Sequence, residues 1–187
     1  MSTIFRKTQL LITWLMVIAT ISACAPATTP APTPTPSITP TRAEMAILLE
    51  RGMHGSEYAP PQGSGTVFAD VPLSYWAVNW IEKLYADGIT AGCSTAPLAY
   101  CPENSVTHAE MAVFLLKSKH GAAYTPPSAT GIFADVPTSY WAANWIEQLY
   151  AEGITDGCNL SPLSYCPEQP VTRDQMAVFI ERTFNQP

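Results

Sequence analysis

The sequence predicts an all-α fold built from about two and a third internal repeats. A segment that begins at Phe68 returns 65 residues later at Phe133, and the second half of the same unit, which begins at Val106, returns at Val171. A third copy of that second half stands upstream at 41–46, without a first half before it. Repeats of this length cannot each bury an apolar face alone, so we expect the copies to stack and to form grooves between them.

Each full repeat is expected to open with a helix. In the second copy Pro137 suits a first helical turn, and Trp141, Trp145 and Leu149 recur at i, i+4 and i+8 to give one apolar face. Gly153 is placed to end this helix. The first copy repeats the pattern with Trp76, Trp80, Leu84 and Gly88.

The second helix of each copy is expected to begin with a capping box, in which the N-cap and N3 side chains bond to each other's backbone N–H groups. The pairs are Thr41 with Glu44, Thr107 with Glu110, and Thr172 with Gln175. The sequence thus predicts five helices: the second helix of all three copies and the first helix of the two full copies. We interpret the proline-rich segments between them as loops.

The N-terminal part of the chain is expected not to belong to the folded domain. Residues 1–23 carry two basic residues and then an apolar run, which is typical of a secretory signal and too short for a comfortable membrane span. Residues 24–40 form a linker with six prolines, typical of an extended spacer. The predicted domain, 41–187, divides into a partial repeat (41–66) and two full repeats (67–131 and 132–187).

Cys24 stands between the signal and the linker. It follows Ile-Ser-Ala, which resembles the lipobox of bacterial lipoproteins, where the cysteine becomes the acylated first residue. We therefore predict an exported protein that is anchored to a membrane by lipid at Cys24. The alternative is an ordinary signal cut near Ala23 or Ala25, which would leave a free thiol.

The charge of the chain argues against a nucleic-acid partner. Without the signal, the chain keeps seven basic and fifteen acidic residues, a net charge of −8, and no basic patch occurs. Nucleic-acid binding depends on clustered lysine and arginine side chains.

The remaining cysteines recur as two pairs, Cys93 with Cys101 and Cys158 with Cys166. In an exported chain this pattern predicts two local disulfides. The alternative, a four-cysteine zinc site, lacks the usual spacing of two to four residues between ligands. No histidine falls in a recognised catalytic arrangement, so we expect no enzyme activity, no cofactor and no metal site.

The repeats resemble a known family in their motifs. Phe-x-Asp-Val-Pro-x-x-Tyr-Trp-Ala, Gly-Ile-Thr-x-Gly and Cys-Pro-x-x-x-Val-Thr occur in register in both full copies, and Thr-Arg-Ala-Glu stands at 41–44. Together they resemble the S-layer homology (SLH) repeat, over essentially everything after residue 40. The resemblance implies a pseudo-threefold helical bundle with one central helix per repeat. It also implies a non-catalytic module that holds exported proteins to the bacterial envelope by binding cell-wall glycans in grooves between repeats.

This chain departs from the family pattern at two places. The first repeat lacks its first helix, and His108 stands where the other copies have Arg42 and Arg173. Both arginines fall at N1 of a helix, where a cation is mildly unfavourable unless an anion lies against the helix N-terminus. The resemblance implies that they contact the acidic group of the glycan, with His108 as the third such residue.

Two further kinds of residue are candidates for ligand contact. Asp70 and Asp135 precede a helix start and either complete a turn or bind sugar hydroxyls. The tryptophans at helical spacing are more usual in a core, but one of each pair could stack on a sugar, and Trp76 and Trp141 are our candidates.

We therefore predict a lipid-anchored module that binds cell-wall polysaccharide. The alternative is an envelope assembly protein, in which the seam left by the missing helix pairs with a second subunit or a partner protein.

Overall fold

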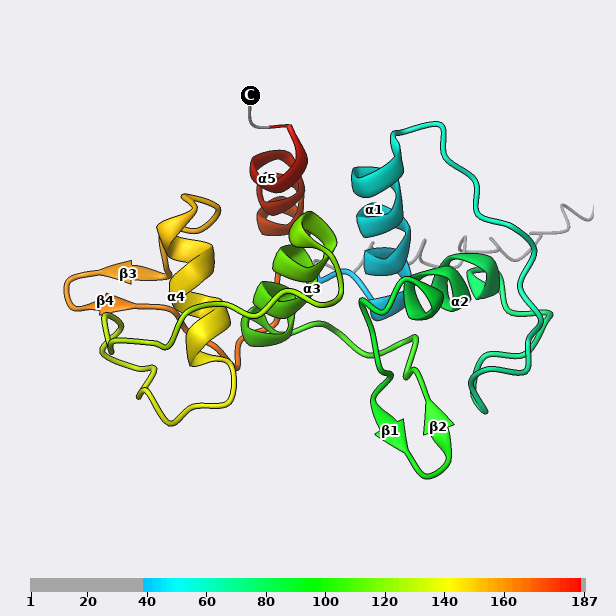
Figure 1. Cartoon of the computed structure of the whole chain (residues 1–187), viewed down its shortest axis with the longest axis horizontal. Helices are drawn as coiled ribbons and strands as arrows, with labels where there is room; N and C mark the ends of the chain where they lie inside the picture. Colours follow the sequence, from blue (N-terminus) through cyan, green and yellow to red (C-terminus); the bar gives the residue numbers. More distant parts are fainter. Residues whose placement is uncertain (1–38, 186–187) are drawn as a thin grey trace, which may run out of the picture. The chain divides into compact units, whose positions relative to one another are not determined.

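A computed structural model describes residues 39–185, so the predicted signal, Cys24 and most of the linker lie outside the described residues. No helix in the described range is long and apolar enough to cross a membrane. The helices are α1 Arg42–His54, α2 Val78–Ala86, α3 His108–His120, α4 Ala143–Ala151 and α5 Arg173–Phe184 (Figure 1). The strands are β1 Ser94–Thr95, β2 Leu98–Ala99, β3 Asn159–Leu160 and β4 Leu163–Ser164.

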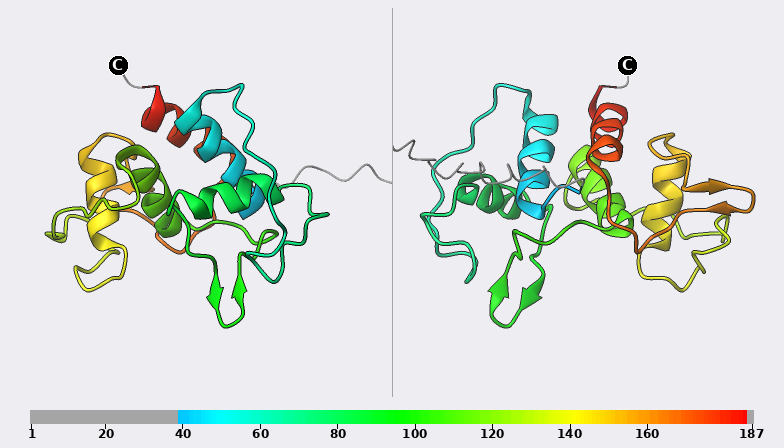
Figure 2. Two further views of the ribbon diagram at one scale, coloured as in Figure 1. Left: turned by 45° about the vertical axis from the view of Figure 1, so that its right-hand side comes forward. Right: turned by 180° about the vertical axis from the view of Figure 1, so that it is seen from behind.

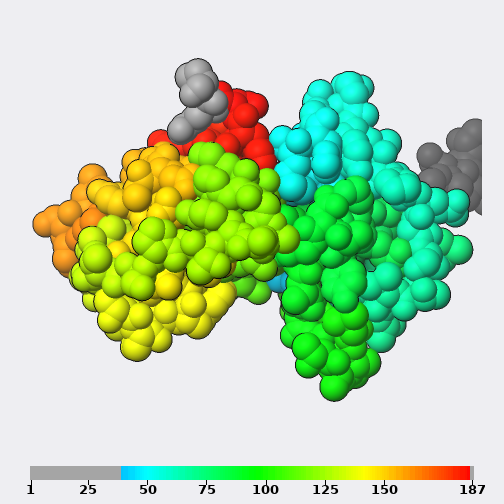
Figure 3. Space-filling view, in the orientation of Figure 1, coloured from blue at the N-terminus to red at the C-terminus, as the bar shows by residue number. Residues whose placement is uncertain are grey.

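The prediction of an all-α fold is wrong. The segments that we interpreted as loops contain two antiparallel sheets, in which Thr95 pairs with Leu98 and Leu160 pairs with Leu163. Each disulfide brings the two ends of its segment together, and the backbone groups between them then pair with each other rather than with water. The fold therefore combines five helices with two small sheets within residues 39–185, and Figure 3 shows the β1–β2 segment as a green projection at the bottom of the view.

Both predicted disulfides are confirmed. Cys93 bonds to Cys101 with a Cα–Cα distance of 6.0 Å, and Cys158 bonds to Cys166 with a Cα–Cα distance of 5.9 Å. All four thiols are used in these bonds, so the alternative of a four-cysteine zinc site is wrong.

The three capped helices form the centre of the domain. Helices α1, α3 and α5 each contact the other two, while α2 packs on α1 and α4 packs on α3 (Figure 2). The capping boxes at Thr41, Thr107 and Thr172 are confirmed, with both reciprocal hydrogen bonds present in each. Buried methionine, leucine and alanine side chains from these helices make up much of the core.

The first helix of each full repeat starts later than predicted. Pro137 lies in a turn, where its carbonyl accepts a hydrogen bond from Tyr140 N at 2.8 Å, and α4 begins only at Ala143. Trp141 therefore precedes the helix, and the helical spacing that we assigned to it does not apply. The predicted helix end is confirmed, because Gly153 has a φ of 70° and Ile154 N donates to Leu149 O at 3.1 Å.

Candidate functional site

The N1 side chain of each capped helix reaches the N3 side chain of another, in a closed cycle of three contacts. The distances are 3.1 Å from Arg42 Nη1 to Glu110 Oε1, 3.2 Å from His108 Nε2 to Gln175 Oε1, and 2.6 Å from Arg173 Nη2 to Glu44 Oε1. The three predicted N1 residues thus lie at the three junctions between the central helices, but their surroundings differ.

Arg42 is part of the core. Its side chain is 3% exposed, and its Nε donates to Tyr100 O at 2.9 Å. The guanidinium also lies over two rings, 5.0 Å from the centroid of Tyr100 and 5.4 Å from that of Phe114. These contacts fill the junction between α1 and α3 with the arginine itself.

His108 is also buried, and both of its ring nitrogens face oxygen atoms. Nδ1 lies 3.0 Å from Cys166 O, and Nε2 faces the same Gln175 oxygen that accepts from Thr172 N.

The N-terminal amides of α1 and α3 are already bonded to the next repeat. Arg42 N donates to Asn104 O at 2.8 Å, and His108 N donates to Gln169 O at 2.9 Å. The following amide of each helix donates to a proline carbonyl in the same loop. We expected an anion against these helix ends, but carbonyl oxygens occupy that place at α1 and α3.

Asp70 and Asp135 bind the exits of the two hairpins. Asp135 Oδ1 accepts from Tyr165 N at 2.8 Å and Oδ2 accepts from Cys166 N at 2.7 Å, and Asp70 makes the same pair of contacts in the first repeat. Cys166 has a φ of 58°, so the carboxylate supports a turn that side-chain-bearing residues rarely adopt. Whether either aspartate also contacts a ligand stays a prediction.

The four tryptophans of the full repeats divide into two kinds. Trp76 and Trp141 are each 60% exposed, whereas Trp80 and Trp145 are partly buried against the core. Trp80 and Trp145 therefore pack against the core, whereas Trp76 and Trp141 present their rings to solvent.

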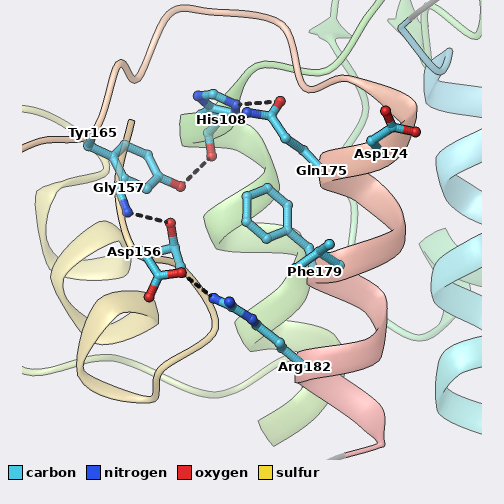
Figure 4. A pocket seen from close by; sticks show the side chains of 10 residues that line it. His108, Asp156, Gly157, Tyr165, Asp174, Gln175, Phe179 and Arg182 are labelled. Carbon is cyan, nitrogen blue, oxygen red and sulfur yellow. Dashed lines mark hydrogen bonds and ion pairs between the residues drawn. The ribbon is translucent and has the colours of Figure 1, made fainter. Parts of the chain in front are cut away.

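One groove lies between α3, α5 and the loop after α4, and we call it the His108 groove (Figure 4). Its volume is about 260 Å³. Arg182 crosses it, with Nη1 2.8 Å from Asp156 Oδ2, and Tyr165 OH donates to His108 O at 2.9 Å on the opposite side. Its lining residues include His108, Asp156, Tyr165, Asp174, Phe179 and Arg182.

Sequence reasoning missed two residues of this groove, Arg182 and Asp156. The internal repeat carried a signal for the first, because Arg51 and Lys117 are the matching basic residues in the other copies. The internal repeat carried no such signal for Asp156, because the matching residue in the first full repeat is Ala91.

A second groove, which we call the Arg173 groove, has a volume of about 320 Å³. It brings together two predicted residues from distant parts of the sequence, Arg173 and Trp76, beside Glu44, Ile47 and Leu48. Burial raises the pKa of Glu44, but hydrogen bonds from Arg173 and from Thr41 outweigh it and hold that pKa below its usual value. The groove therefore pairs a charged guanidinium–carboxylate edge with an exposed indole ring.

The two grooves occupy equivalent places in the repeat pattern. Gln175, Val178 and Phe179 of the His108 groove match Glu44, Ile47 and Leu48 of the Arg173 groove. The third equivalent place is the junction filled by Arg42. Two of the three junctions are therefore hollow, and one is packed.

Known proteins share part of this sequence. The chain is 29% identical to an endoglucanase of Bacillus sp. (strain KSM-635) over 117 residues, which are 63% of this chain and 12% of the enzyme. It is 31% identical to endo-1,4-beta-xylanase A of Thermoanaerobacterium saccharolyticum over 112 residues, 60% of this chain and 9% of the enzyme. It is 24% identical to a cellulosome-anchoring protein of Acetivibrio thermocellus over 148 residues, 78% of this chain and 32% of that protein.

The chain therefore spans between 9% and 32% of the length of these three relatives. No protein-family profile matches it. The similarity is consistent with a cell-surface type of module, and the matched segment is a small part of each enzyme.

Proposed function

We propose that the domain is a non-catalytic module that attaches the protein to the cell envelope by binding cell-wall glycan. The observation that carries the proposal is the distribution of the similarity: one segment recurs in an endoglucanase, in a xylanase and in a cellulosome-anchoring protein. A segment shared by such different proteins, and covering so little of the enzymes, serves a purpose that their catalytic activities do not explain. We assign attachment as that purpose, because one of these relatives is a cellulosome-anchoring protein.

The two open grooves are the proposed binding places. In the Arg173 groove the guanidinium offers paired N–H donors to an acidic sugar substituent, and Trp76 offers an apolar face to the ring of the sugar. In the His108 groove Arg182 plays the role of the cation, and Asp156 and Asp174 accept hydrogen bonds from hydroxyls. Two weak sites on one domain gain avidity when both bind the same polymer.

Cosedimentation of the full-length protein with purified sacculi, before and after removal of secondary polymers, tests this function. The matched pair of variants is Trp76→Ala and Trp141→Ala, because both rings are 60% exposed, Trp76 lines the Arg173 groove, and Trp141 lines neither of the two grooves. We expect Trp76→Ala to lower retention about tenfold, since loss of a stacked ring costs roughly 1–2 kcal/mol. Trp141→Ala should leave retention unchanged, and equal retention of both variants would contradict the assignment of the groove.

The membrane anchor at Cys24 belongs to the same proposal. A lipid at this residue would hold the membrane while the proline-rich linker spans the distance to the glycan. Labelling cells with a fatty-acid analogue should mark the wild-type protein and not Cys24→Ala. Equal labelling of both, or none of either, argues against the anchor.

A second candidate function is self-assembly through α5. Ala46 on α1 and Ala112 on α3 are fully buried, and α2 and α4 pack on these two helices, but the equivalent Ala177 on α5 is exposed. An apolar groove of about 460 Å³ lies there, between α1 and α5. It is bordered by Arg173 near the start of α5 and by Glu181 near its end.

The proposed occupant is α5 of a second copy. In an antiparallel pair, the basic start of one helix faces the acidic end of the other, and the small Ala177 at the midpoint permits close approach. Analytical ultracentrifugation should show a dimer that Ala177→Glu dissociates. The neighbouring Val178→Glu is the control, because Val178 lines the His108 groove instead and should affect only glycan retention.

A further inference from the structure

Three side chains with metal-binding atoms meet where α1 and α2 end. They are Glu50 and His54, one turn apart on α1, and Asp87, which caps the C-terminus of α2. One ligand atom from each lies within 4.8 Å of the others. This cluster is separate from both grooves of the proposed function.

Glu50 is the unusual member of the cluster. Its side chain is fully buried, and neither carboxylate oxygen has a hydrogen-bond partner. A buried carboxylate without partners is costly, so its retention calls for a counter-charge.

The distances fit a metal ion better than a direct ion pair. His54 Nε2 lies 3.5 Å from Glu50 Oε2 and 3.6 Å from Asp87 Oδ2, both too long for a good hydrogen bond. Ligands about 2.1 Å from a tetrahedral zinc ion are separated from each other by about 3.4 Å. The two separations from His54 therefore match two edges of such a tetrahedron, and the third, between Glu50 and Asp87, is within 4.8 Å.

The surroundings favour a cation and permit its entry. The partial negative charges of two helix C-termini converge on the cluster. His54 is 37% exposed and Asp87 is 26% exposed, so an ion can reach the site from solvent. Lys83 is the competitor, since its Nζ donates to both oxygens of Asp87, at 2.6 Å to Oδ2.

We propose that Glu50, His54 and Asp87 bind a divalent transition-metal cation, with Zn²⁺ the best match to one imidazole and two carboxylates. Water completes the fourth position, and the ion ties the end of α1 to the end of α2. This departs from the sequence-based expectation that the chain holds no metal.

The second repeat provides an internal comparison. There Leu116 replaces Glu50, and His120 Nε2 instead lies 2.8 Å from Glu152 Oε1, within hydrogen-bond distance. Lys119 supplies a further ion pair to Glu152 at 3.0 Å. The equivalent position in the second repeat therefore lacks a third ligand, and Lys119 neutralises the Glu152 carboxylate. We expect this position not to bind the ion.

Calorimetric titration of the full-length protein with ZnCl₂, after EDTA treatment and without a polyhistidine tag, tests the proposal. We expect one Zn²⁺ per chain and an accompanying rise in Tm. Glu50→Leu and His54→Asn copy residues from the other repeats, so both should fold, and each should weaken Zn²⁺ binding at least 100-fold. His120→Asn is the matched control and should bind as the wild type does.

A fourth variant, Lys83→Gln, copies Gln148 of the second repeat and removes the cation that competes for Asp87. It should bind Zn²⁺ several-fold more tightly than the wild type. The proposal is overturned if the wild-type protein does not bind Zn²⁺, or if Glu50→Leu binds it as well as the wild type.

Discussion

Arg42 and Arg173 begin equivalent helices but experience different environments. Arg42 is 3% exposed and packs between two aromatic rings, whereas Arg173 is 44% exposed at the edge of a groove. We expect Arg42→Ala to lower the free energy of unfolding by about 3 kcal/mol, because it breaks a buried pair and leaves Tyr100 O without its donor. Arg173→Ala removes an exposed pair and should cost less than about 1 kcal/mol. Urea denaturation measures both, and equal losses would contradict the assignment of Arg42 to the core.

The sequence alone could not separate these two arginines. Their immediate neighbours are similar, but the rings that enclose Arg42 come from Tyr100 and Phe114, which lie 58 and 72 residues away in the sequence. The first repeat has no hairpin to place beside Arg173, since its first half is missing. The local sequence pattern therefore predicts where an arginine lies in its helix, but not which side chains from other segments pack over it.

Glu147 gives stability a dependence on pH. Its carboxylate accepts hydrogen bonds from the backbone N–H groups of Thr130, Gly131 and Ile132, at 2.6 to 3.1 Å. Burial raises the pKa of Glu147, but these hydrogen bonds outweigh it and hold that pKa below its usual value.

Because the folded-state pKa is depressed, the stability that Glu147 contributes is present above its unfolded-state pKa and is lost as pH falls through the folded-state value. Glu147→Gln should therefore unfold about 1–2 kcal/mol more easily than the wild type at pH 7, and the difference should shrink below about pH 4.5. Urea denaturation across this range measures it. A difference that does not change with pH would show that the charge of the carboxylate is not involved.

The β3–β4 hairpin joins the disulfide of the second repeat to the His108 groove. Its exit residue, Tyr165, donates through its hydroxyl to His108 O and through its backbone to Asp135. Replacing both Cys158 and Cys166 by serine should cost about 2.5 kcal/mol, from the nine-residue loop that the bond closes. Thermal unfolding measures the loss, and dithiothreitol should lower the stability of the wild type more than that of the double variant, which keeps only the Cys93–Cys101 bond.

The sequence predicted helices and their caps better than it predicted strands. Each capping box depends on residues three positions apart, so its signal is local and recurs unchanged in three copies. The hairpin strands are two residues long, which is too short for an alternating pattern, and their pairing follows from the disulfide rather than from propensity. The starts of α2 and α4 were misplaced because neither helix has a side-chain cap to mark it.

The repeat pattern predicted that copies stack, but not how the ends of the series meet. Helix α5 lies against α1 as well as α3, so the first and last copies are in contact. The loop of each full repeat also bonds to the N-terminal amides of the preceding capped helix, as Asn104 O does for Arg42 and Gln169 O does for His108. Every copy is thus tied to both others, which differs from an open array in which each repeat contacts only its neighbours.

This closure predicts that residues 39–185 unfold in a single cooperative step. An open array of repeats can lose a terminal copy first, whereas here removing α5 exposes the core face of both α1 and α3. Far-ultraviolet circular dichroism and tryptophan fluorescence should therefore report the same urea midpoint. The destabilising variants at the two ends, Arg42→Ala and the Cys158/Cys166 double serine, should each shift both signals together. Separate midpoints, or a shift confined to one signal, would show that the copies unfold independently despite the contact between α1 and α5.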